Sequence, residues 1–340
     1  MTRVGRLGVA IATVALAAVL GLGGTHGALR AQRPQQERRV EGGLEVLQLR
    51  QNFFMIAGAG GNIGVQTGPD GAVVVDTGSA DKADAVVAAI KQLTDRPIRY
   101  VINTSATDHH VGGNEKVARA GQTIFQLTNP IAAGLTNQGA AAILAAEDVL
   151  LRMSAPTGQT APFPAGAWPT ETFHQRRSYM RLNGEGIETL RQPSAHTDGD
   201  SVVFFRRSDV VMAGDVLDAT AFPVIDIERG GSIQGEIDAL NRLVDLAIPN
   251  FPLVWQEGGT LVIPGHGHVY EQLDVVEYRD MITIIRDRVQ AMVDKGLTLE
   301  QVKAASPTQG YTRRYGSDSG PWTTSRFVDA VYRSLKGRAK

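Results

Sequence analysis

The order of apolar and polar positions predicts short strands at the start of the fold. Apolar or alternating runs are separated by Gly-rich or Pro-Asp-Gly turns, as in consecutive antiparallel strands. In the helix that follows, apolar residues recur at helical spacing up to about Leu93, and Ser79 or Asp81 can cap its start. A further apolar run predicts a strand ending at Ile102. The predicted strands cover 44–50, 52–57, 62–67, 72–75 and 98–102.

The middle of the chain predicts a helical region and then a long loop. The helical region begins at Asn129 and runs to about Met153, and residues 154–172 are rich in Pro, Thr and Gly. Long loops in compact domains are often lids or substrate walls. Phe163 and Trp168 give this loop apolar surface, which either contacts a ligand or only anchors the loop.

The second half repeats the strand pattern, which predicts two similar halves that face one another. Asn183-Gly184 is a strong hairpin signal between two strand-like runs. The predicted elements are strands at 179–182, 186–190, 201–205 and 209–212, a helix at 233–246 and a strand at 260–263. Beyond Tyr270 the pattern is helical, at 271–294, after a capping box that begins at Thr298, and at 324–335. These last helices show no candidate chemistry.

Composition limits the chemistry. The 340 residues include 34 Lys and Arg against 35 Asp and Glu, so charge gives no reason to propose a nucleic-acid partner. Cysteine is absent, which excludes disulfides and thiolate ligands. Any metal site must therefore use histidine and carboxylate ligands.

The N-terminus has the pattern of an export signal. Arg3 and Arg6 precede an uncharged run from Leu7 to Leu29. We expect residues 1–31 to be a signal peptide or an uncleaved signal anchor, and 32–43 to be a polar linker. The prediction is a periplasmic or extracellular protein, with membrane contact only through an uncleaved N-terminal segment.

Histidines and one carboxylate lie at the ends of several predicted strands. Residues 103–114 read NTSATDHHVGGN, with two adjacent histidines before a Gly-Gly turn. His196, Asp215 and His266 lie at other predicted strand ends. A lone histidine is more often structural than a ligand, and His174 and His268 are interpreted so. Four strand ends that converge nevertheless predict one site, and a metal is its simplest occupant.

A Gly-rich run at 58–61 raises the alternative of a dinucleotide site. Ile63 stands where the third glycine of that fingerprint would fall, and a strand rather than a helix follows. We therefore expect no nucleotide cofactor.

These motifs together resemble the metallo-β-lactamase fold superfamily. The resemblance covers about 44–270 and rests on VVVDTG (73–78), the 103–113 segment, AHTDGDSVVFF (195–205), AGD (213–215) and IPGH (263–266). It implies an α/β fold, a four-layer αββα sandwich over 44–270 with a C-terminal helical extension at 271–340. It also implies a site for one or two zinc ions at the strand ends, between the halves.

The chain departs from the family motif at the first metal site. Laid on residues 105–110, the family's His-x-His-x-Asp-His places Ser105 and Thr107 at the two leading histidines, which would hold the first zinc together with His196. Hydroxyls that are neutral near pH 7 are poor replacements. The resemblance therefore implies a first site that is empty or weak.

The second metal site is retained in altered form. The resemblance implies that His109, in place of the family's Asp, and His110 bind one zinc ion with Asp215 and His266. Neutral His109 raises the charge of this centre by one unit, which favours a bound hydroxide. Asp108 lies one place out of register, and a small backbone shift would exchange its role with that of His109. The residues expected to brace the site are Asp76, Ser105, Thr107 and Asp108.

The resemblance implies a zinc-dependent hydrolase in which water activated by the metal attacks a carbonyl carbon of a small molecule. The substrate would be an ester, thioester, lactone or lactam, and the residues expected to act in catalysis are Asp215 and His196. Whether Asp215 bridges, ligates or acts as a general base remains open. The alternative is a non-catalytic descendant that binds a ligand or partner in the old cleft, because both leading histidines are replaced.

Overall fold

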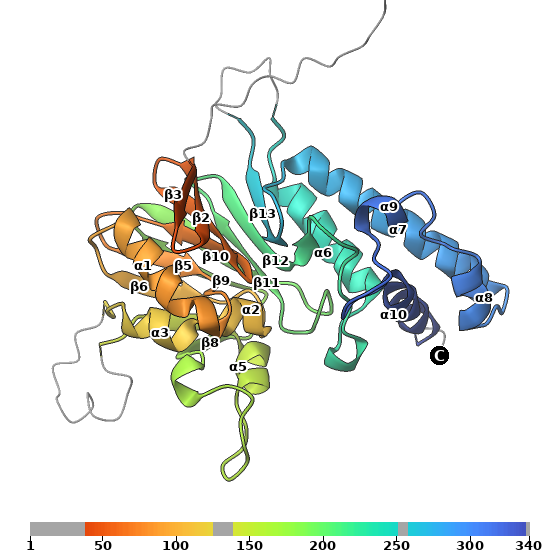
Figure 1. The fold of residues 1–340 in the computed structure, drawn as a ribbon, viewed down its shortest axis with the longest axis horizontal. Coiled ribbons are helices and arrows are strands. Elements are labelled where there is room, and N and C mark those ends of the chain that lie inside the picture. The colour runs from red at the N-terminus through yellow and green to blue at the C-terminus, as the bar shows by residue number, and fades with distance from the viewer. Residues whose placement is uncertain (1–37, 125–138, 251–257, 338–340) are drawn as a thin grey trace, which may run out of the picture. The chain divides into compact units, whose positions relative to one another are not determined.

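We describe a computed structural model of the chain, in which residues 38–124, 139–250 and 258–337 are described (Figure 1). The predicted segment 1–31, residues 32–37 of the predicted linker and the start of the predicted helix at Asn129 lie outside these ranges. Within the described ranges, no helix combines the length and apolar character needed to cross a membrane.

The first sheet has eight strands in chain order, so that each strand pairs with the next. Strands β1 to β5 pair antiparallel, and β5 to β8 pair parallel. The strands are β1 Arg38–Glu41, β2 Leu44–Arg50, β3 Phe53–Ala59, β4 Gly61–Gln66, β5 Ala72–Val75, β6 Ile98–Ile102, β7 Ala142–Ala146 and β8 Glu171–Phe173.

The second sheet has five strands in the order β13-β12-β11-β10-β9. Strands β9 to β12 pair antiparallel, and β13 joins β12 in parallel as an edge strand. The strands are β9 Arg177–Leu182, β10 Glu185–Arg191, β11 Ser201–Phe205, β12 Val210–Asp218 and β13 Leu261–His266.

Helices cover the outer face of each sheet, with α1 and α3 on one side and α6, α7 and α10 on the other (Figure 1). The helices are α1 Ala83–Leu93, α2 Asp108–Val111, α3 Asn114–Arg119, α5 Glu147–Met153, α6 Ile233–Leu246, α7 Gln272–Asp294, α8 Leu299–Ala304, α9 Thr312–Tyr315 and α10 Thr324–Lys336. Short 3-10 helices are η1 Ala80–Lys82, η2 Ala165–Ala167 and η3 Ile227–Arg229.

Three hydrophobic clusters separate four layers. On β5, Val74 packs outward in the cluster that includes α1 residues, whereas Val73 and Val75 pack inward between the sheets. The inner cluster joins the sheets, as where the rings of Phe53 and Phe205 meet edge to face at 4.8 Å between centroids. A third cluster lies between the second sheet and α6, α7 and α10. This arrangement confirms the predicted αββα sandwich.

The structure differs from the sequence prediction at residues 38–41. These residues, assigned to a linker, form β1 and pair with β2 from Arg38↔Leu47 to Glu41↔Leu44. An edge strand needs only main-chain partners, and polar side chains are common there. Polar composition therefore did not exclude a strand.

The predicted helix up to Met153 is wrong over residues 142–146. The segment AILAA forms β7, between β6 and β8 in the first sheet, and only Glu147–Met153 is helical as α5. A short run of small apolar residues fits a buried strand or a helix equally well. Tertiary pairing with β6 decides in favour of the strand.

The segment 154–172 contains regular structure, and its aromatic residues anchor it. It includes η2 and the start of β8. Phe163 and Trp168 pack against the cluster between the sheets, and Trp168 Nε1 donates to the Phe163 carbonyl at 2.9 Å. Ser79, proposed as a helix cap, precedes η1 without a side-chain hydrogen bond to it.

Candidate metal centre

The predicted site residues follow the ends of strands in both sheets. Asp76 follows β5, the segment that bears His109 and His110 follows β6, and His266 ends β13. Asp215 lies within β12, where the pairing register with β13 shifts on both sides of Gly214. Such irregular pairing re-aims side chains at a sheet edge. At this point a side chain on Gly214, whose φ is 56°, would lie 2.5 Å from Thr104 Oγ1.

Four of the predicted ligands lie together. His109, His110, Asp215 and His266 offer ligand atoms that are all within 4.8 Å of one another. Asp215 Oδ1 lies 2.8 Å from His110 Nε2, 3.3 Å from His109 Nε2 and 4.0 Å from His266 Nε2. Three imidazoles thus surround one carboxylate oxygen, on elements from both halves of the fold.

Asp76 orients the His110 ring by accepting a hydrogen bond from its Nδ1. His110 is fully buried, and its Nδ1 donates to Asp76 Oδ2 at 2.7 Å. Asp76 also accepts from the Thr104 backbone N–H at 2.8 Å and the Thr104 hydroxyl at 2.7 Å. Asp76 has a φ of 61°, a left-handed conformation that is unusual outside glycine. Because Nδ1 carries this hydrogen bond, Nε2 is the atom that faces the other ligands.

The second oxygen of Asp215 is held by hydroxyls. Ser105 donates to Asp215 Oδ2 at 3.0 Å, and Thr107 donates to the same oxygen at 2.9 Å. These residues stand where the family motif has its leading histidines. The two positions therefore stabilise the carboxylate by hydrogen bonds.

His196 lies near Asp215 Oδ2, the oxygen to which the Ser105 and Thr107 hydroxyls donate. Its Nδ1 is 3.5 Å from Asp215 Oδ2 and 3.3 Å from Asp200 Oδ1, and it is outside the group of four. Asp200 also accepts from the Thr197 backbone N–H at 2.5 Å, which fixes the turn after β10. His196 is thus held by two carboxylates.

In the chain without metal, the electrostatics of the site favour protonated His110 and His196 beside an ionised Asp215. Burial disfavours the imidazolium form of His110, but Asp215 and Asp76 outweigh it and raise its pKa well above the usual value. Burial likewise opposes charge on His196, whose pKa Asp215 and Asp200 raise to about 9. Burial would raise the pKa of Asp215, but His110 and His196 hold it well below its usual range.

The half-buried His266 behaves differently from His110. Burial, together with the neighbouring His109, lowers the pKa of His266. Its ring centroid lies 4.7 Å from that of His109. His266 therefore favours the neutral form that binds metals.

The donor set fits a divalent metal ion. Tetrahedral zinc, with bonds of about 2.0–2.1 Å to nitrogen and oxygen, sets its ligand atoms about 3.3 Å apart. The Asp215 contacts of 2.8, 3.3 and 4.0 Å bracket that spacing. Small side-chain shifts would bring all four atoms around one ion.

The other predicted residues lie outside the group. Asp108 begins α2 and is exposed, while His109, one position later, faces Asp215. His174 is exposed, and His268 lies against the Tyr270 ring at 5.0 Å between centroids. Sequence reasoning missed Thr104, Asp200 and Asn62, which contact site residues or their loops through hydrogen bonds.

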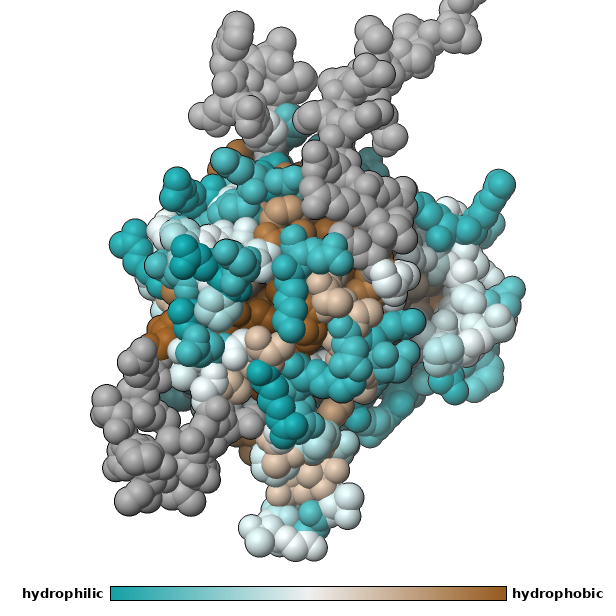
Figure 2. Space-filling model, turned by 60° about the vertical axis from the view of Figure 1, so that its left-hand side comes forward, coloured by the Kyte–Doolittle hydropathy of each residue, from teal (hydrophilic) through white to brown (hydrophobic). Residues whose placement is uncertain are grey.

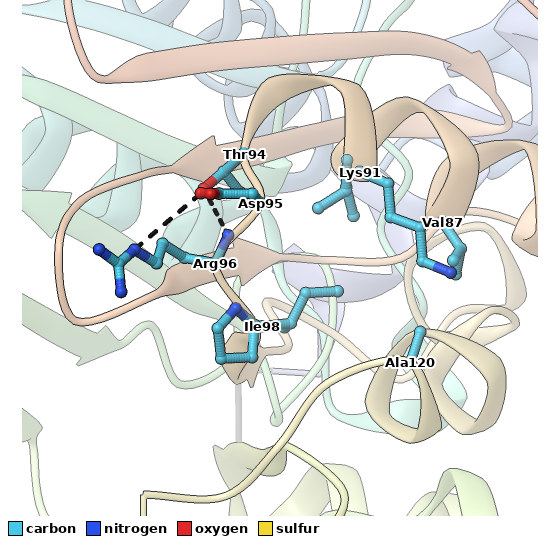
Figure 3. A pocket seen from close by; sticks show the side chains of 9 residues that line it. Val87, Lys91, Thr94, Asp95, Arg96, Ile98 and Ala120 are labelled. Atoms are coloured by element: carbon cyan, nitrogen blue, oxygen red, sulfur yellow. Dashed lines mark hydrogen bonds and ion pairs between the residues drawn. The ribbon is translucent and has the colours of Figure 1, made fainter.

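A surface cavity of about 280 Å³ lies away from this group. Val87 and Lys91 of α1, Arg96 and Ile98 line it (Figure 3). Ile98 begins β6, whereas the histidine segment follows the other end of that strand. Figure 2, in which the left-hand side of Figure 1 comes forward, shows apolar patches crossed by hydrophilic side chains. The cavity therefore belongs to the outer surface, not to the histidine site.

Comparison with known proteins supports the resemblance seen in the sequence. The family model of the metallo-beta-lactamase superfamily matches residues 57–152, which include β4, β5 and the histidine segment. Together with the four-layer fold, this match supports the resemblance to the metallo-β-lactamase superfamily.

The chain is similar to alkylsulfatases and to a metallo-beta-lactamase. The chain is 23% identical over 299 residues to a linear primary-alkylsulfatase from a Pseudomonas strain, covering 79% of this chain and 54% of that protein. The inverting sec-alkylsulfatase Pisa1 from Pseudomonas sp. has a TM-score of 0.60 at 16% identity, covering 85% of this chain and 49% of that one. A metallo-beta-lactamase from Pontibacter korlensis has a TM-score of 0.51 at 17% identity, covering 71% of this chain and 99% of that one. The chain spans about half the length of both alkylsulfatases.

Proposed function

We propose that the protein is a metal-dependent hydrolase that holds one divalent ion, zinc, in the group His109, His110, Asp215 and His266. The observation that carries the proposal is the convergence of three imidazole nitrogens and one carboxylate within 4.8 Å. A zinc ion bound there supplies a Lewis acid for the substrate and lowers the pKa of a water molecule towards neutrality.

The chain's own residues set the protonation of this centre. Asp76 fixes the Nδ1 proton of His110, so that its Nε2 lone pair is available to a metal once the Nε2 proton leaves. His196 holds a proton at Nδ1 between Asp200 and Asp215, beside the proposed reaction centre. We propose that His196 and Asp215 assist proton transfer to the leaving group.

The hydrogen bonds of Asp215 support one ion rather than two. A carboxylate that bridges two ions through both oxygens needs Oδ2 for a metal, but here Ser105 and Thr107 donate to Oδ2. Hydroxyls are weak zinc ligands when neutral. We therefore propose that Asp215 binds the metal through Oδ1 alone.

The substrate proposed is a small-molecule ester or lactam. Carbonyl esters, thioesters, lactones and lactams follow from the superfamily, whereas the alkylsulfatase relatives favour sulfate esters as a second class. The N-terminal pattern supports the further proposal that the chain is exported.

Metal analysis combined with hydrolysis assays tests the proposal. We expect one zinc ion per chain by elemental analysis, and hydrolysis of a carbonyl ester or an alkyl sulfate that a chelator abolishes. His110→Ala should lower both metal affinity and rate by more than about 100-fold, beyond the loss typical of an outer partner. His174→Ala, at an exposed histidine outside the group, is the matched control.

Two results would overturn the hydrolase proposal. Hydrolysis that is unchanged in His110→Ala, in a protein without zinc, would exclude metal catalysis at this site. A folded chain that binds no metal and hydrolyses no ester of either class would instead favour the non-catalytic alternative, a cleft that binds a ligand or partner.

A further inference from the structure

The turn between β3 and β4 lies against both histidine-bearing segments. A side chain on Gly61 would lie 3.0 Å from the His109 carbonyl oxygen and 3.4 Å from the Gly265 carbonyl oxygen. It would also lie 3.3 Å from His110 Cε1. Only a residue without a side chain lets the main chain pass this close to both segments. The Gly-Gly run at 60–61 thus serves close packing at the candidate metal centre.

Asn62, the next residue, joins this turn to the loop that carries His266. Its amide Nδ2 donates to the Pro264 carbonyl at 2.9 Å and to the Gly267 carbonyl at 3.0 Å. Asn62 is 4% exposed, so these bonds are shielded from water. The two acceptors bracket His266 in sequence, and both amide protons are used. One buried side chain of the first sheet therefore fixes both sides of the His266 position.

This anchor matters because His266 lies at a strand end, where its carbonyl also accepts from the Ala219 N–H at 3.1 Å. It ends β13, the edge strand of the second sheet, between Gly265 and Gly267. Its side chain is 31% exposed and lies 4.0 Å from Asp215, whereas the His110 side chain is fully buried and lies 2.8 Å from it. A loop with two glycines has many accessible conformations, and a buried anchor removes most of them.

We propose that Asn62 is a positioning residue that sets the place of His266 in the metal centre through its two donated hydrogen bonds. The inference rests on the proposed metal-binding function. Loss of the anchor releases the loop and leaves two carbonyl groups without their donor. Residues that support metal ligands typically change metal affinity by about 10–100-fold when replaced, and we expect that loss here.

Asn62→Asp tests the proposal, because a carboxylate has the shape of the amide but cannot donate when ionised. Zinc affinity is measured by competition with a chromophoric chelator, and the visible spectrum of the Co²⁺ form reports ligand geometry. Asn183→Asp is the matched control. Asn183 Nδ2 also donates twice, to Gln66 Oε1 and the Gly71 carbonyl at 2.8 Å each, at the opposite end of β4. We expect the Asn62 variant alone to lose affinity and change the spectrum.

A cycle with His266→Ala separates positioning from general damage. If Asn62 acts through His266, Asn62→Asp should cost no further zinc affinity once His266 is absent. An equal loss in both backgrounds, or no loss in the wild-type background, would overturn the proposal. Asn62→Ala, which removes the donor without adding charge, should repeat the Asn62→Asp result, and a normal affinity in that variant would also overturn it.

Hydrogen exchange keeps this test separate from that of the proposed function. In the metal-free chain, Asn62→Asp should speed exchange of backbone amides near 264–268, and Asn183→Asp should leave them unchanged. If the wild type binds no metal, the proposed function fails, while faster exchange near 264–268 would still support the anchor. Unchanged exchange in that segment would overturn the anchor in either case.

Discussion

The two oxygens of Asp215 face two differently built regions. Around Oδ1 lie His109, His110 and His266, three nitrogen donors that fit a metal ion. Around Oδ2 lie the hydroxyls of Ser105 and Thr107, which already donate to it. In this chain one side is equipped for metal and the other for hydrogen bonding.

The difference shows how both oxygens of one carboxylate can be paired when only one of them faces nitrogen donors. A buried carboxylate that loses a metal on one side needs replacement donors. Two hydroxyls supply them at 3.0 and 2.9 Å, and they bring no formal charge. His196 remains on this side, 3.5 Å from Oδ2 and paired with Asp200. Ser105 and Thr107 are thus the residues that keep the two regions different.

Restoring the missing histidines should break the comparison most strongly. In the double variant Ser105→His, Thr107→His, two imidazoles would join His196 around Oδ2 and give it a donor set like that around Oδ1. We expect the zinc content to rise from one ion per chain to two, with faster hydrolysis if a second ion aids the reaction. Elemental analysis and steady-state assays on the same preparation measure both effects.

The size-matched variant Ser105→Asn, Thr107→Asn controls for bulk at the buried Ser105 and the half-buried Thr107. It fills similar space with weak zinc ligands and should keep a single ion. If the double-histidine variant folds and still binds only one ion, the region around Oδ2 lacks more than its histidines, and the comparison drawn here is wrong.

Asp76→Asn should weaken the metal side alone. Asparagine tolerates the left-handed backbone at this position, where φ is 61°. Its amide would face His110 Nδ1 with a donor, which favours the tautomer that carries its proton on Nε2 and blocks metal binding there. We expect zinc affinity to fall by about 10–100-fold, a change that competition with a chelator resolves.

Asp70→Asn serves as the control for Asp76→Asn. Asp70 Oδ2 accepts from the Asn183 backbone N–H at 2.8 Å, at the end of β4 remote from the site. Its replacement should leave zinc affinity within error. Equal affinity in the Asp76 variant and the wild type would show that the hydrogen bond to His110 Nδ1 does not govern metal binding.

The fold was largely predictable because its periodic signals agree with its tertiary contacts. Strands 44–50, 72–75 and 98–102 and helix 233–246 form with the predicted bounds. The failures lie where local pattern is ambiguous. The AILAA segment of β7 fits either structure, and β1 is polar because an edge strand needs no apolar face.

The positions of the candidate site residues were predictable from the sequence, but the hydrogen bonds that hold them were not. Family motifs indicated which strand ends carry ligands, and the structure brings four of these residues together. The bonds from Ser105 and Thr107 to Asp215 depend on how two distant strands are set against each other. Asn62 bonds to a carbonyl 202 positions away. In sequence, Gly60, Gly61 and Asn62 indicate only a turn, since no local pattern reveals such a partner.

The smallest predicted effect concerns a buried acid that interacts with the Oδ2 side. Glu236 on α6 is fully buried, and neither side-chain oxygen has a hydrogen-bond partner among the described residues. Burial raises its pKa well above the usual 4.5, and Asp200 and Asp215 raise it further. The folded chain therefore keeps this group neutral at pH values where the unfolded chain ionises it. Its stability contribution is full below about pH 4.5 and falls as the pH rises above that value.

Glu236→Gln removes this titration and should stabilise the metal-free chain near neutral pH relative to the wild type. The gain should shrink to nothing, or reverse, as the pH falls to about 4, because the wild-type acid is then neutral in both states. Urea unfolding at several pH values measures the difference. Glu277→Gln, at an exposed position on the neighbouring helix α7, is the control. Its free energy of unfolding should stay within about 0.5 kcal/mol of the wild-type value at every pH. The opposite result would be a variant whose stability relative to the wild type is lower at pH 7 than at pH 4. That result would mean that the folded chain holds the Glu236 carboxylate ionised.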